Sequence, residues 1–166
     1  YSVTASDANG CTAVDQVTVT VGSAVANAGP DQTICLGAST TLSATGGTSY
    51  QWSTGATTQS ITVNPSSTTT YTVTVSDVNG CTDVDQVTVN VSSVTVEAGP
   101  NQTICLGSST TLNATGTGTF YQWSTGQTGQ SITVNPVTTT TYNVTTSDAN
   151  GCTAVDQVTV LSLIHI

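Results

Sequence analysis

YTVTVSDVNGCTDVDQVTV, residues 71–89, is the stretch that decides the fold of this chain. Tyr71–Val75 (YTVTV) alternates apolar and polar residues, which is the period of a half-buried β-strand. An Asn-Gly dipeptide then supplies the positive φ that a tight hairpin needs. The apolar alternation resumes at Val87–Val91, so the stretch predicts a β-hairpin with one apolar face. Val84 is out of phase with those valines, which predicts a β-bulge near Asp85-Gln86.

The same hairpin occurs three times, because residues 1–19 (YSVTASDANGCTAVDQVTV) and residues 142–160 (YNVTTSDANGCTAVDQVTV) repeat it almost unchanged. The repeat is therefore about 70 residues long, which is too long for a solenoid rung and suits a small sandwich domain. The chain begins inside a strand and has no methionine, so we expect an internal fragment. The expected organisation is the C-terminal hairpin of a truncated repeat at 1–22, full repeats at 23–92 and 93–160, and a non-native tail at 161–166.

Each full repeat contains several further strand patterns separated by turn residues. In residues 23–92 these are the edge segment VANAGPDQTIC with a Gly-Pro change of direction, then TLSAT, YQW and SITV, and then the hairpin. No segment has the apolar spacing of a helix. The predicted fold class is all-β, with tandem Ig-like β-sandwich modules of about seven strands each.

The last six residues, LSLIHI at 161–166, depart from the repeat. They resemble the translation of a sequencing-library adaptor, and we expect them to be foreign to the fold. The single histidine, His165, lies in this tail, so we expect no function for its side chain.

The charge of the chain excludes several classes of protein. It has no Lys or Arg, nine Asp and Glu, and a net charge of −9. A chain without cations is unsuited to phosphate backbones, so nucleic acid is not an expected partner. No apolar run approaches the roughly 20 residues of a membrane-spanning helix, so membrane insertion is not expected either.

Four cysteines stand at equivalent places in the two full repeats. Cys35 and Cys81 belong to residues 23–92, and Cys105 and Cys152 belong to residues 93–160. We expect one disulfide within each repeat, since a 70-residue sandwich has a thin core and benefits from a covalent link. Cys11 would then have its partner outside the chain. The alternatives are free thiols buried as small apolar groups and, less favoured because close Cys or His pairs are missing, a zinc site. Disulfides indicate an oxidising, extracellular compartment.

The motifs AGPDQTICLG, TLSAT, YQWSTG, SITVNP, TTTYTVTVSDVNGC and DQVTV occur together within residues 1–160. In combination they resemble the Ig-like/PKD-like repeats of very large secreted and surface proteins of gliding bacteria. That resemblance implies attachment outside the cell after export by a C-terminal sorting domain. PKD domains proper carry a segment like WDFGDG, whereas Trp52 is followed here by STG, so the Ig-like branch is the better match.

Acidic and polar residues around the hairpin turn are the candidate ligands for a cation. Asp77, Asn79, Asp83 and Asp85 could gather oxygen atoms around Ca²⁺. Asp83 is replaced by alanine in both other copies of the hairpin, which leaves too few carboxylates there. We therefore expect turn chemistry and no metal. Asp31, replaced by asparagine at 101, is likewise not expected to be a charged ligand.

The aromatic residues and threonines of the repeat are expected to be structural. Trp52 and Trp123 stand in strands, in phase with a neighbouring tyrosine, like the core tryptophan of a sandwich, although stacking on sugars is the alternative. Tyr71 and Tyr142 resemble a tyrosine corner, whose hydroxyl caps nearby backbone. The outward-facing threonines suit an exposed strand, or alternatively an ice- or glycan-binding face or O-linked sugars. They are Thr72, Thr74 and Thr88.

No catalytic constellation is visible, so we expect no enzyme and no cofactor. Glu97 is the only Glu and lacks a counterpart in the other repeat, and no base is available for a Ser or Thr nucleophile. The expected function is a non-catalytic stalk, spacer or adhesive module of an extracellular bacterial surface protein, with neighbouring repeats, polysaccharide or another cell surface as partners. The alternatives are a carbohydrate- or ice-binding accessory module of a secreted protein, and self-assembly through edge strands.

Overall fold

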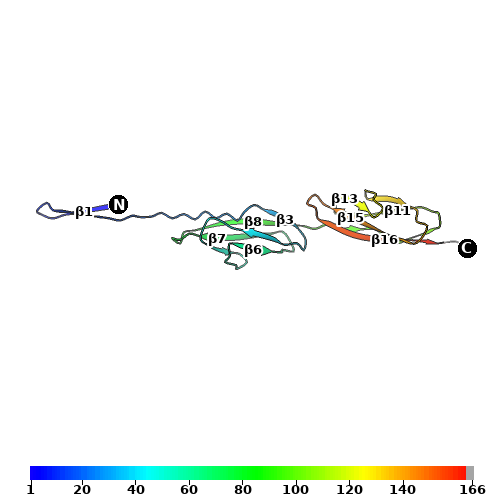
Figure 1. The fold of residues 1–166 in the computed structure, drawn as a ribbon, viewed down its shortest axis with the longest axis horizontal. Coiled ribbons are helices and arrows are strands. Elements are labelled where there is room, and N and C mark those ends of the chain that lie inside the picture. The colour runs from blue at the N-terminus through cyan, green and yellow to red at the C-terminus, as the bar shows by residue number, and fades with distance from the viewer. Residues whose placement is uncertain (164–166) are drawn as a thin grey trace. The chain divides into compact units, whose positions relative to one another are not determined.

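The computed structural model describes residues 1–163, and within them every regular element is a β-strand. The predicted all-β fold class is therefore confirmed. Figure 1 shows the strands along the chain. Their bounds are β1 Ser2–Ser6, β2 Thr12–Gln16, β3 Gln32–Cys35, β4 Thr40–Ser43, β5 Ser49–Trp52, β6 Ser60–Val63, β7 Thr69–Ser76, β8 Thr82–Ser92, β9 Val96–Glu97, β10 Gln102–Cys105, β11 Thr110–Asn113, β12 Thr115–Gly116, β13 Phe120–Trp123, β14 Ser131–Val134, β15 Thr140–Ser147 and β16 Thr153–Leu163.

The chain divides into two compact units. The first comprises residues 1–29, 42–61 and 71–87, and the second comprises residues 30–41, 62–70 and those from 88 onward. The division passes through β4, β6, β7 and β8, so the limits of the units differ from the limits of the sequence repeats.

The two full repeats contain the same sheets. Residues 23–92 form a four-stranded sheet in the order β3-β8-β7-β5 and a two-stranded sheet β4-β6, while the next repeat forms β10-β16-β15-β13 and β11-β14. The edge strands β3 and β10 run parallel to β8 and β16, with Gln32 opposite Val89 and Gln102 opposite Val160. Each repeat therefore has the two-layer, Ig-like sandwich that the strand pattern predicts.

The first segment of each repeat changes sheets at its Gly-Pro step. Before this step, Asn27 bridges Thr45 in one repeat, and β9 pairs with β12 in the other. After it, β3 and β10 join the opposite, four-stranded sheet. Gly29 and Gly99 have φ angles of 84° and 83°, a backbone conformation that residues with a Cβ rarely adopt. The predicted change of direction is confirmed.

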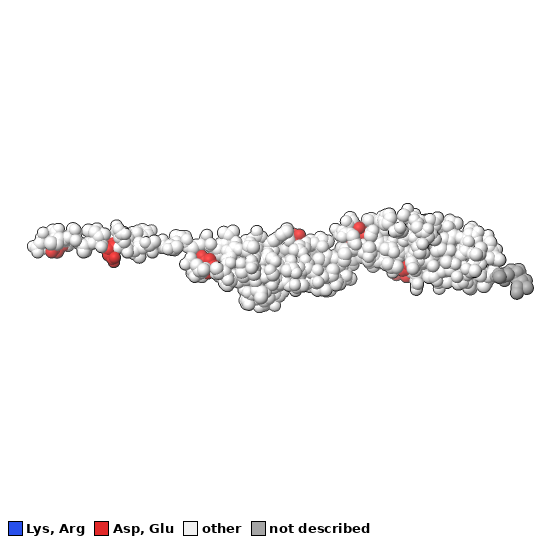
Figure 2. Space-filling model, viewed as in Figure 1, with Lys and Arg blue, Asp and Glu red and all other residues white. Residues whose placement is uncertain are grey.

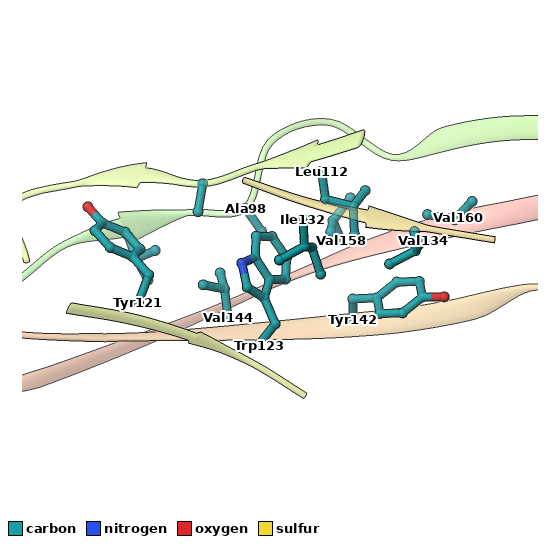
Figure 3. Packing of buried hydrophobic residues seen from close by; sticks show 12 residues of the cluster. Ala98, Leu112, Tyr121, Trp123, Ile132, Val134, Tyr142, Val144, Val158 and Val160 are labelled. Atoms are coloured by element: carbon teal, nitrogen blue, oxygen red, sulfur yellow. The ribbon is translucent and has the colours of Figure 1, made fainter. Parts of the chain in front are cut away.

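The core of residues 93–160 lies between its two sheets, as Figure 3 shows. Leu112 and Ile132 come from the two-stranded sheet and pack against Trp123, Val144 and Val158 of the four-stranded sheet. All five side chains are at most 5% exposed. The corresponding residues of the other full repeat are buried as well, namely Leu42, Trp52, Ile61, Val73 and Val87. Alternation along each strand directs these side chains to one face, which is what builds the sandwich.

The first hairpin has the same backbone pairing but a different environment. β1 and β2 pair antiparallel from Ser2↔Gln16 to Ser6↔Thr12. Tyr1 and Val3 are 89% and 65% exposed, whereas Tyr71 and Val73 at the matching positions are 9% and 0% exposed. Hairpin formation is thus a local property of this stretch, and burial of its apolar face requires the other sheet of a repeat.

The predicted bulge near Asp85-Gln86 is wrong. In β16 the register with β15 runs without interruption from Thr140↔Val160 to Ser147↔Thr153. The exposure of β8 also alternates without a break from Thr82 to Asn90. Val84 simply faces outward and is 54% exposed, while an aspartate occupies the inward-facing position beside it.

The tail does not depart from the fold as early as expected. β16 continues through Leu163, with Leu161 and Leu163 opposite Thr103 and Cys105 of β10. Strand pairing uses backbone groups, so it accepts almost any side chain. Ser162 stands where the preceding repeat has Val91, and its buried hydroxyl has no hydrogen-bond partner, which marks it as a poor fit to this position. His165 lies outside the described residues.

Figure 2 shows the acidic residues as isolated red patches on a surface otherwise free of charged side chains. Among residues 1–163 no helix is long and apolar enough to cross a membrane.

Candidate functional site: the hairpin turn and the disulfide

The hairpin turn has the same geometry in all three copies. Asp148 is its first residue, and the Oδ1 atom of Asp148 accepts the backbone N–H groups of Asn150 (2.9 Å) and Cys152 (2.8 Å). Asp7 and Asp77 make the corresponding pairs of bonds at 2.8 to 2.9 Å. The glycine before each cysteine has a φ angle near +80°, as at Gly151 (81°). This is the three-residue hairpin loop, in which an aspartate and a left-handed glycine close the turn.

Within the second compact unit, the turn of residues 148–152 is bound by the end of the preceding repeat. The hydroxyl of Ser92 donates a hydrogen bond to Oδ2 of Asp148. This bond is the main reason that the pKa of Asp148 lies below its ordinary value, while partial burial opposes the shift and the turn N–H groups add to it. Both oxygens of the carboxylate therefore have partners.

Within the first compact unit, Gly22 occupies the place that corresponds to Ser92. A Cβ atom on Gly22 would lie 2.5 Å from Oδ2 of Asp77 and 3.1 Å from Sγ of Cys81. The linker thus approaches the next hairpin turn here too, and a side chain at position 22 would require the side chains of the turn to shift. The pKa of Asp77 is lowered chiefly by the N–H of Cys81.

The disulfide of the structure joins Cys35 to Cys152, both in the second compact unit, with 5.4 Å between their Cα atoms and 117 residues of separation. The predicted pairing of Cys35 with Cys81 and of Cys105 with Cys152 is therefore wrong. Cys11, Cys81 and Cys105 are free thiols in the structure. The bond crosses from one sequence repeat to the next instead of closing a loop within one repeat.

The physical reason is the length of the hairpin strand. Cys105 ends β10 and lies opposite Leu163 at the end of β16, whereas Cys152 directly precedes the start of β16. The 11 residues of that strand span about 36 Å. Two cysteines can be joined only when their Cα atoms lie within about 7 Å of each other, so the two cysteines of one repeat cannot meet.

Cys35 can meet Cys152 because the linker brings them together. Cys35 lies opposite Ser92 in the register of β3 with β8. Ser92 in turn contacts Asp148 of the hairpin turn that ends with Cys152. The cysteines occupy equivalent positions in successive repeats, so their spacing is compatible with a bond within one repeat or between two repeats. Only the strand register distinguishes these two possibilities.

The inward-facing aspartate after the turn holds the first segment of its own repeat. Oδ2 of Asp156 accepts the N–H of Ala98 at 2.7 Å, and Oδ2 of Asp85 accepts the N–H of Ala28 at 2.8 Å. The N–H groups of these two alanines are the main cause of the lowered pKa of each aspartate. Asp83 makes a further bond of this kind, to the N–H of Ala26 at 2.9 Å. These roles were missed in the sequence, where the spacing of the aspartates suggested only turn chemistry.

These bonds also disperse the candidate calcium ligands. Asp83 and Asp85 each direct an oxygen at a backbone N–H, while Asp77 uses one oxygen for its own turn. Within residues 1–163 no group of three or more His, Cys, Asp or Glu side chains is arranged to hold a metal ion. The oxygen atoms that were candidate ligands therefore accept backbone N–H groups instead.

The structure explains why an aspartate at position 31 can be an asparagine at the equivalent position 101. Oδ1 of Asp31 accepts the N–H of Thr88, and Oδ1 of Asn101 accepts the N–H of Thr159, each at 2.8 Å. Either side chain provides the oxygen that the backbone needs, so charge is not required.

Glu97 lies in the short strand β9 opposite Thr115 and is exposed.

The two tryptophans are core residues, as predicted. Trp52 and Trp123 are 1% and 2% exposed. Their indole N–H groups donate to the carbonyl oxygens of Thr58 and Gly129, each at 3.0 Å. Neither ring face is open for stacking on a sugar.

The tyrosine-corner prediction is wrong in its hydrogen bond. The rings of Tyr71 and Tyr142 are buried in the core, at 9% and 8% exposure, but neither hydroxyl has a hydrogen-bond partner among the described residues. The other core tyrosine, Tyr121, has a buried hydroxyl that is also without a partner. These tyrosines contribute through the packing of their rings.

Threonines form pairs across the outer face of the four-stranded sheets. The hydroxyl oxygens of Thr70 and Thr88 lie 3.1 Å apart, and those of Thr141 and Thr159 lie 3.0 Å apart. Thr72 and Thr74 are half-buried between the inward-facing residues of β7. Such pairs stabilise neighbouring strands.

Comparison with known proteins assigns this chain to no protein family. No protein-family model matches the chain, and no curated protein matches it. Among solved structures, the chain is similar to the insect immune protein hemolin, with 14% identity and a TM-score of 0.49, over 98% of this chain and 55% of the hemolin chain. It is also similar to domains IG1 and IG2 of DIP-gamma, with 12% identity and a TM-score of 0.45, over 87% of this chain and 97% of that chain.

A third similar structure contains the three N-terminal domains of the bacteriophage RB49 highly immunogenic outer capsid protein. Its identity is 19% and its TM-score is 0.39, over 84% of this chain and 58% of that chain. The chain thus spans little more than half the length of the hemolin and capsid-protein chains. At these scores the similarities do not extend to function, and the fold class rests on the strand order and register of the chain itself.

Proposed function

We propose that residues 23–92 and 93–160 are structural repeats of an extracellular surface protein of bacteria, in which they act as a stalk or spacer and not as a catalyst. Residues 1–22 would be the hairpin of a further repeat, and residues 161–166 a non-native tail. The observation that carries this proposal is the link between consecutive repeats, made by the Cys35–Cys152 disulfide and the bond from Ser92 to Asp148.

This link suits a chain that bears tension. A pulling force that enters before Cys35 passes through the disulfide to Cys152, so the 117 residues of separation are bypassed. Both sandwich cores lie largely within that bypassed segment. Disulfides persist in oxidising compartments, and this bond therefore supports an extracellular location.

Single-molecule pulling on the whole chain tests the proposal. In the reduced chain, complete unfolding should release the bypassed segment, which adds roughly 40 nm of contour length for 117 residues. In the oxidised chain that gain should be missing, and Cys35→Ser should behave like the reduced chain under both conditions. Equal extension of oxidised and reduced chains would contradict the proposed role.

The threonine pairs favour a second candidate function, that of a carbohydrate- or ice-binding accessory module of a secreted protein. The pairs Thr70–Thr88 and Thr141–Thr159 repeat on equivalent outer faces, and regular hydroxyl groups can match a regular ligand surface. Glycan arrays and ice-affinity purification of the whole chain test this candidate, with Thr141→Val/Thr159→Val as the matched variant. Binding that the variant abolishes would support it, and failure to bind either ligand class would remove it.

A further inference from the structure

We infer that Cys81 and Cys105 each form an inter-repeat disulfide of the same kind as Cys35–Cys152. Each would bond to one additional repeat of this kind, Cys81 to the Cys35 position of a preceding repeat and Cys105 to the Cys152 position of a following one. Successive repeats would then be joined by a continuous ladder of disulfides. This inference deepens the proposed function. It rests on that function in one respect, because its disulfides require additional repeats of the same kind.

The equivalence of the positions is the first support. Cys105 ends β10 as Cys35 ends β3, and each strand lies parallel to the return strand of its hairpin. Cys81 follows Asp77 by four residues and donates its N–H to Asp77 Oδ1 at 2.8 Å, as Cys152 does to Asp148. The thiol that bonds in one repeat is therefore presented in the same way in the other.

The approach of the linker to the turn is the second and independent support. Ser92, which lies opposite Cys35, bonds to the turn that holds Cys152. Gly22, the counterpart of Ser92, approaches the turn that holds Cys81, with its Cβ position 3.1 Å from the Cys81 sulfur. A cysteine that stood opposite Gly22, as Cys35 stands opposite Ser92, would therefore come to Cys81.

The chemistry of each bond is an ordinary oxidation. Two thiols lose two protons and two electrons as their sulfurs join, and an oxidised small disulfide such as glutathione disulfide takes up both and becomes two thiols. Cys105 is exposed and Cys81 is partly exposed, so both are accessible to this exchange.

A ladder of this kind has a mechanical consequence. Each bond joins a Cys35-type cysteine to the Cys81-type cysteine of the next repeat. Consecutive bonds therefore overlap, and two of them span the segment between the two cysteines of each repeat. A single cleavage of the backbone inside one repeat would leave both ends joined through the sulfurs of its neighbours.

The test is a chain with three full repeats, made by inserting a second copy of residues 23–92 between Ser92 and Ser93 of the whole protein. The copy carries Leu36→Val and Val78→Ala, two exposed positions (57% and 81%), so that its peptides differ in mass. The chain is refolded with a glutathione redox pair, the remaining thiols are alkylated, and peptides from an Asp- or Glu-specific protease are mapped without reduction.

We expect the number of disulfides to rise from one to two. The original Cys35 should bond to position 81 of the copy, and position 35 of the copy should bond to Cys152. Cys11, the original Cys81 and Cys105 should be alkylated. A disulfide between positions 35 and 81 of one copy, or an alkylated position 81 in the copy, would overturn the inference.

Two controls complete the test. Cys81→Ser in the copy should remove the new disulfide and leave the bond to Cys152, whereas Cys11→Ser should change neither bond. Fluorescence of the buried tryptophans shows that each variant is folded. Equal extension of the oxidised and reduced natural chain would reject the proposed stalk role, whereas an intrarepeat map in the three-repeat chain would reject the ladder alone.

Discussion

Replacing Asp156 by alanine removes the acceptor that holds the first segment of its repeat to the hairpin. Oδ2 of Asp156 accepts the N–H of Ala98 at 2.7 Å, and Ala98 is 2% exposed. In the variant that N–H has no acceptor and no access to water. The first segment should then be held by its pairing in β9 and β10 and by the bond from the Thr159 N–H to Asn101, without the bond to Asp156.

The magnitude follows from the burial of the N–H group. A hydrogen bond to a charged acceptor contributes about 1.5 to 3 kcal/mol, and an unsatisfied buried donor costs about 1 to 3 kcal/mol. These are two descriptions of one loss, so the free energy of unfolding of the repeat should fall by about 2 kcal/mol. For a domain of this size, that corresponds to a decrease in Tm of about 8 to 16 °C.

Asp15 offers a matched control within the same chain. It occupies the equivalent position in the first hairpin and accepts the N–H of its neighbour Gln16 at 2.8 Å. The N–H of Gln157 likewise helps to lower the pKa of Asp156, so both aspartates interact with the N–H of the following residue. They differ in the bond to the first segment, and Asp15→Ala should therefore leave the unfolding of residues 93–160 unchanged.

Urea unfolding followed by the fluorescence of Trp123, in a Trp52→Phe background, measures the effect. The N–H groups of Ala98 and Gln157 lower the pKa of Asp156 below its ordinary value of 3.8. A carboxylate with a lowered pKa in the folded state stabilises the fold above its unfolded pKa, and this contribution disappears as the pH falls through the folded pKa. The difference between the wild type and Asp156→Ala should thus be full at pH 7 and shrink below pH 3.8.

Two results would refute this reasoning. One is an unchanged urea midpoint of Trp123 in Asp156→Ala, which would show that the bond to Ala98 does not stabilise the repeat. The other is a difference that persists undiminished at pH 2, which would show that the charge of Asp156 does not contribute.

Other changes test the disulfide, the tyrosine and the turn. Reduction, or Cys152→Ser, should lower the free energy of unfolding by about 5 kcal/mol, because the bond closes a loop of 117 residues; a loss below 1 kcal/mol in equilibrium unfolding would contradict the pairing. Alkylation of the folded chain without reductant should label Cys11, Cys81 and Cys105 and spare the other two cysteines, as mass spectrometry would show. Tyr142→Phe should change stability by less than about 0.5 kcal/mol, since its hydroxyl has no partner, and a larger loss by calorimetry would restore the tyrosine corner. Gly151→Ala should cost about 1 to 2 kcal/mol, because φ at this residue is 81°; an unchanged Tm would show that the turn relaxes.

The repeat itself, the strands and the core were evident from the sequence because they depend on local periodicity. Alternation along the chain assigns Val73 and Trp52 to an inward face wherever a second sheet exists to cover them. The Asn-Gly turn closes the hairpin even in residues 1–19, where the apolar side of the hairpin is exposed. These features require no knowledge of distant contacts.

The partners of the polar and sulfur atoms were decided only by the tertiary structure. Asp77 opens a hairpin turn and Asp156 follows one. Asp156 nevertheless accepts a distant backbone N–H, whereas Asp77 accepts N–H groups of its own loop. Cys35 bonds to a residue 117 positions away in the next repeat, because a fully extended strand separates the two cysteines of each repeat. In a tandem array, equivalent cysteines recur at equal intervals, so spacing cannot distinguish a bond within a repeat from a bond between repeats. Strand length and register make that distinction, and they exist only in the folded chain.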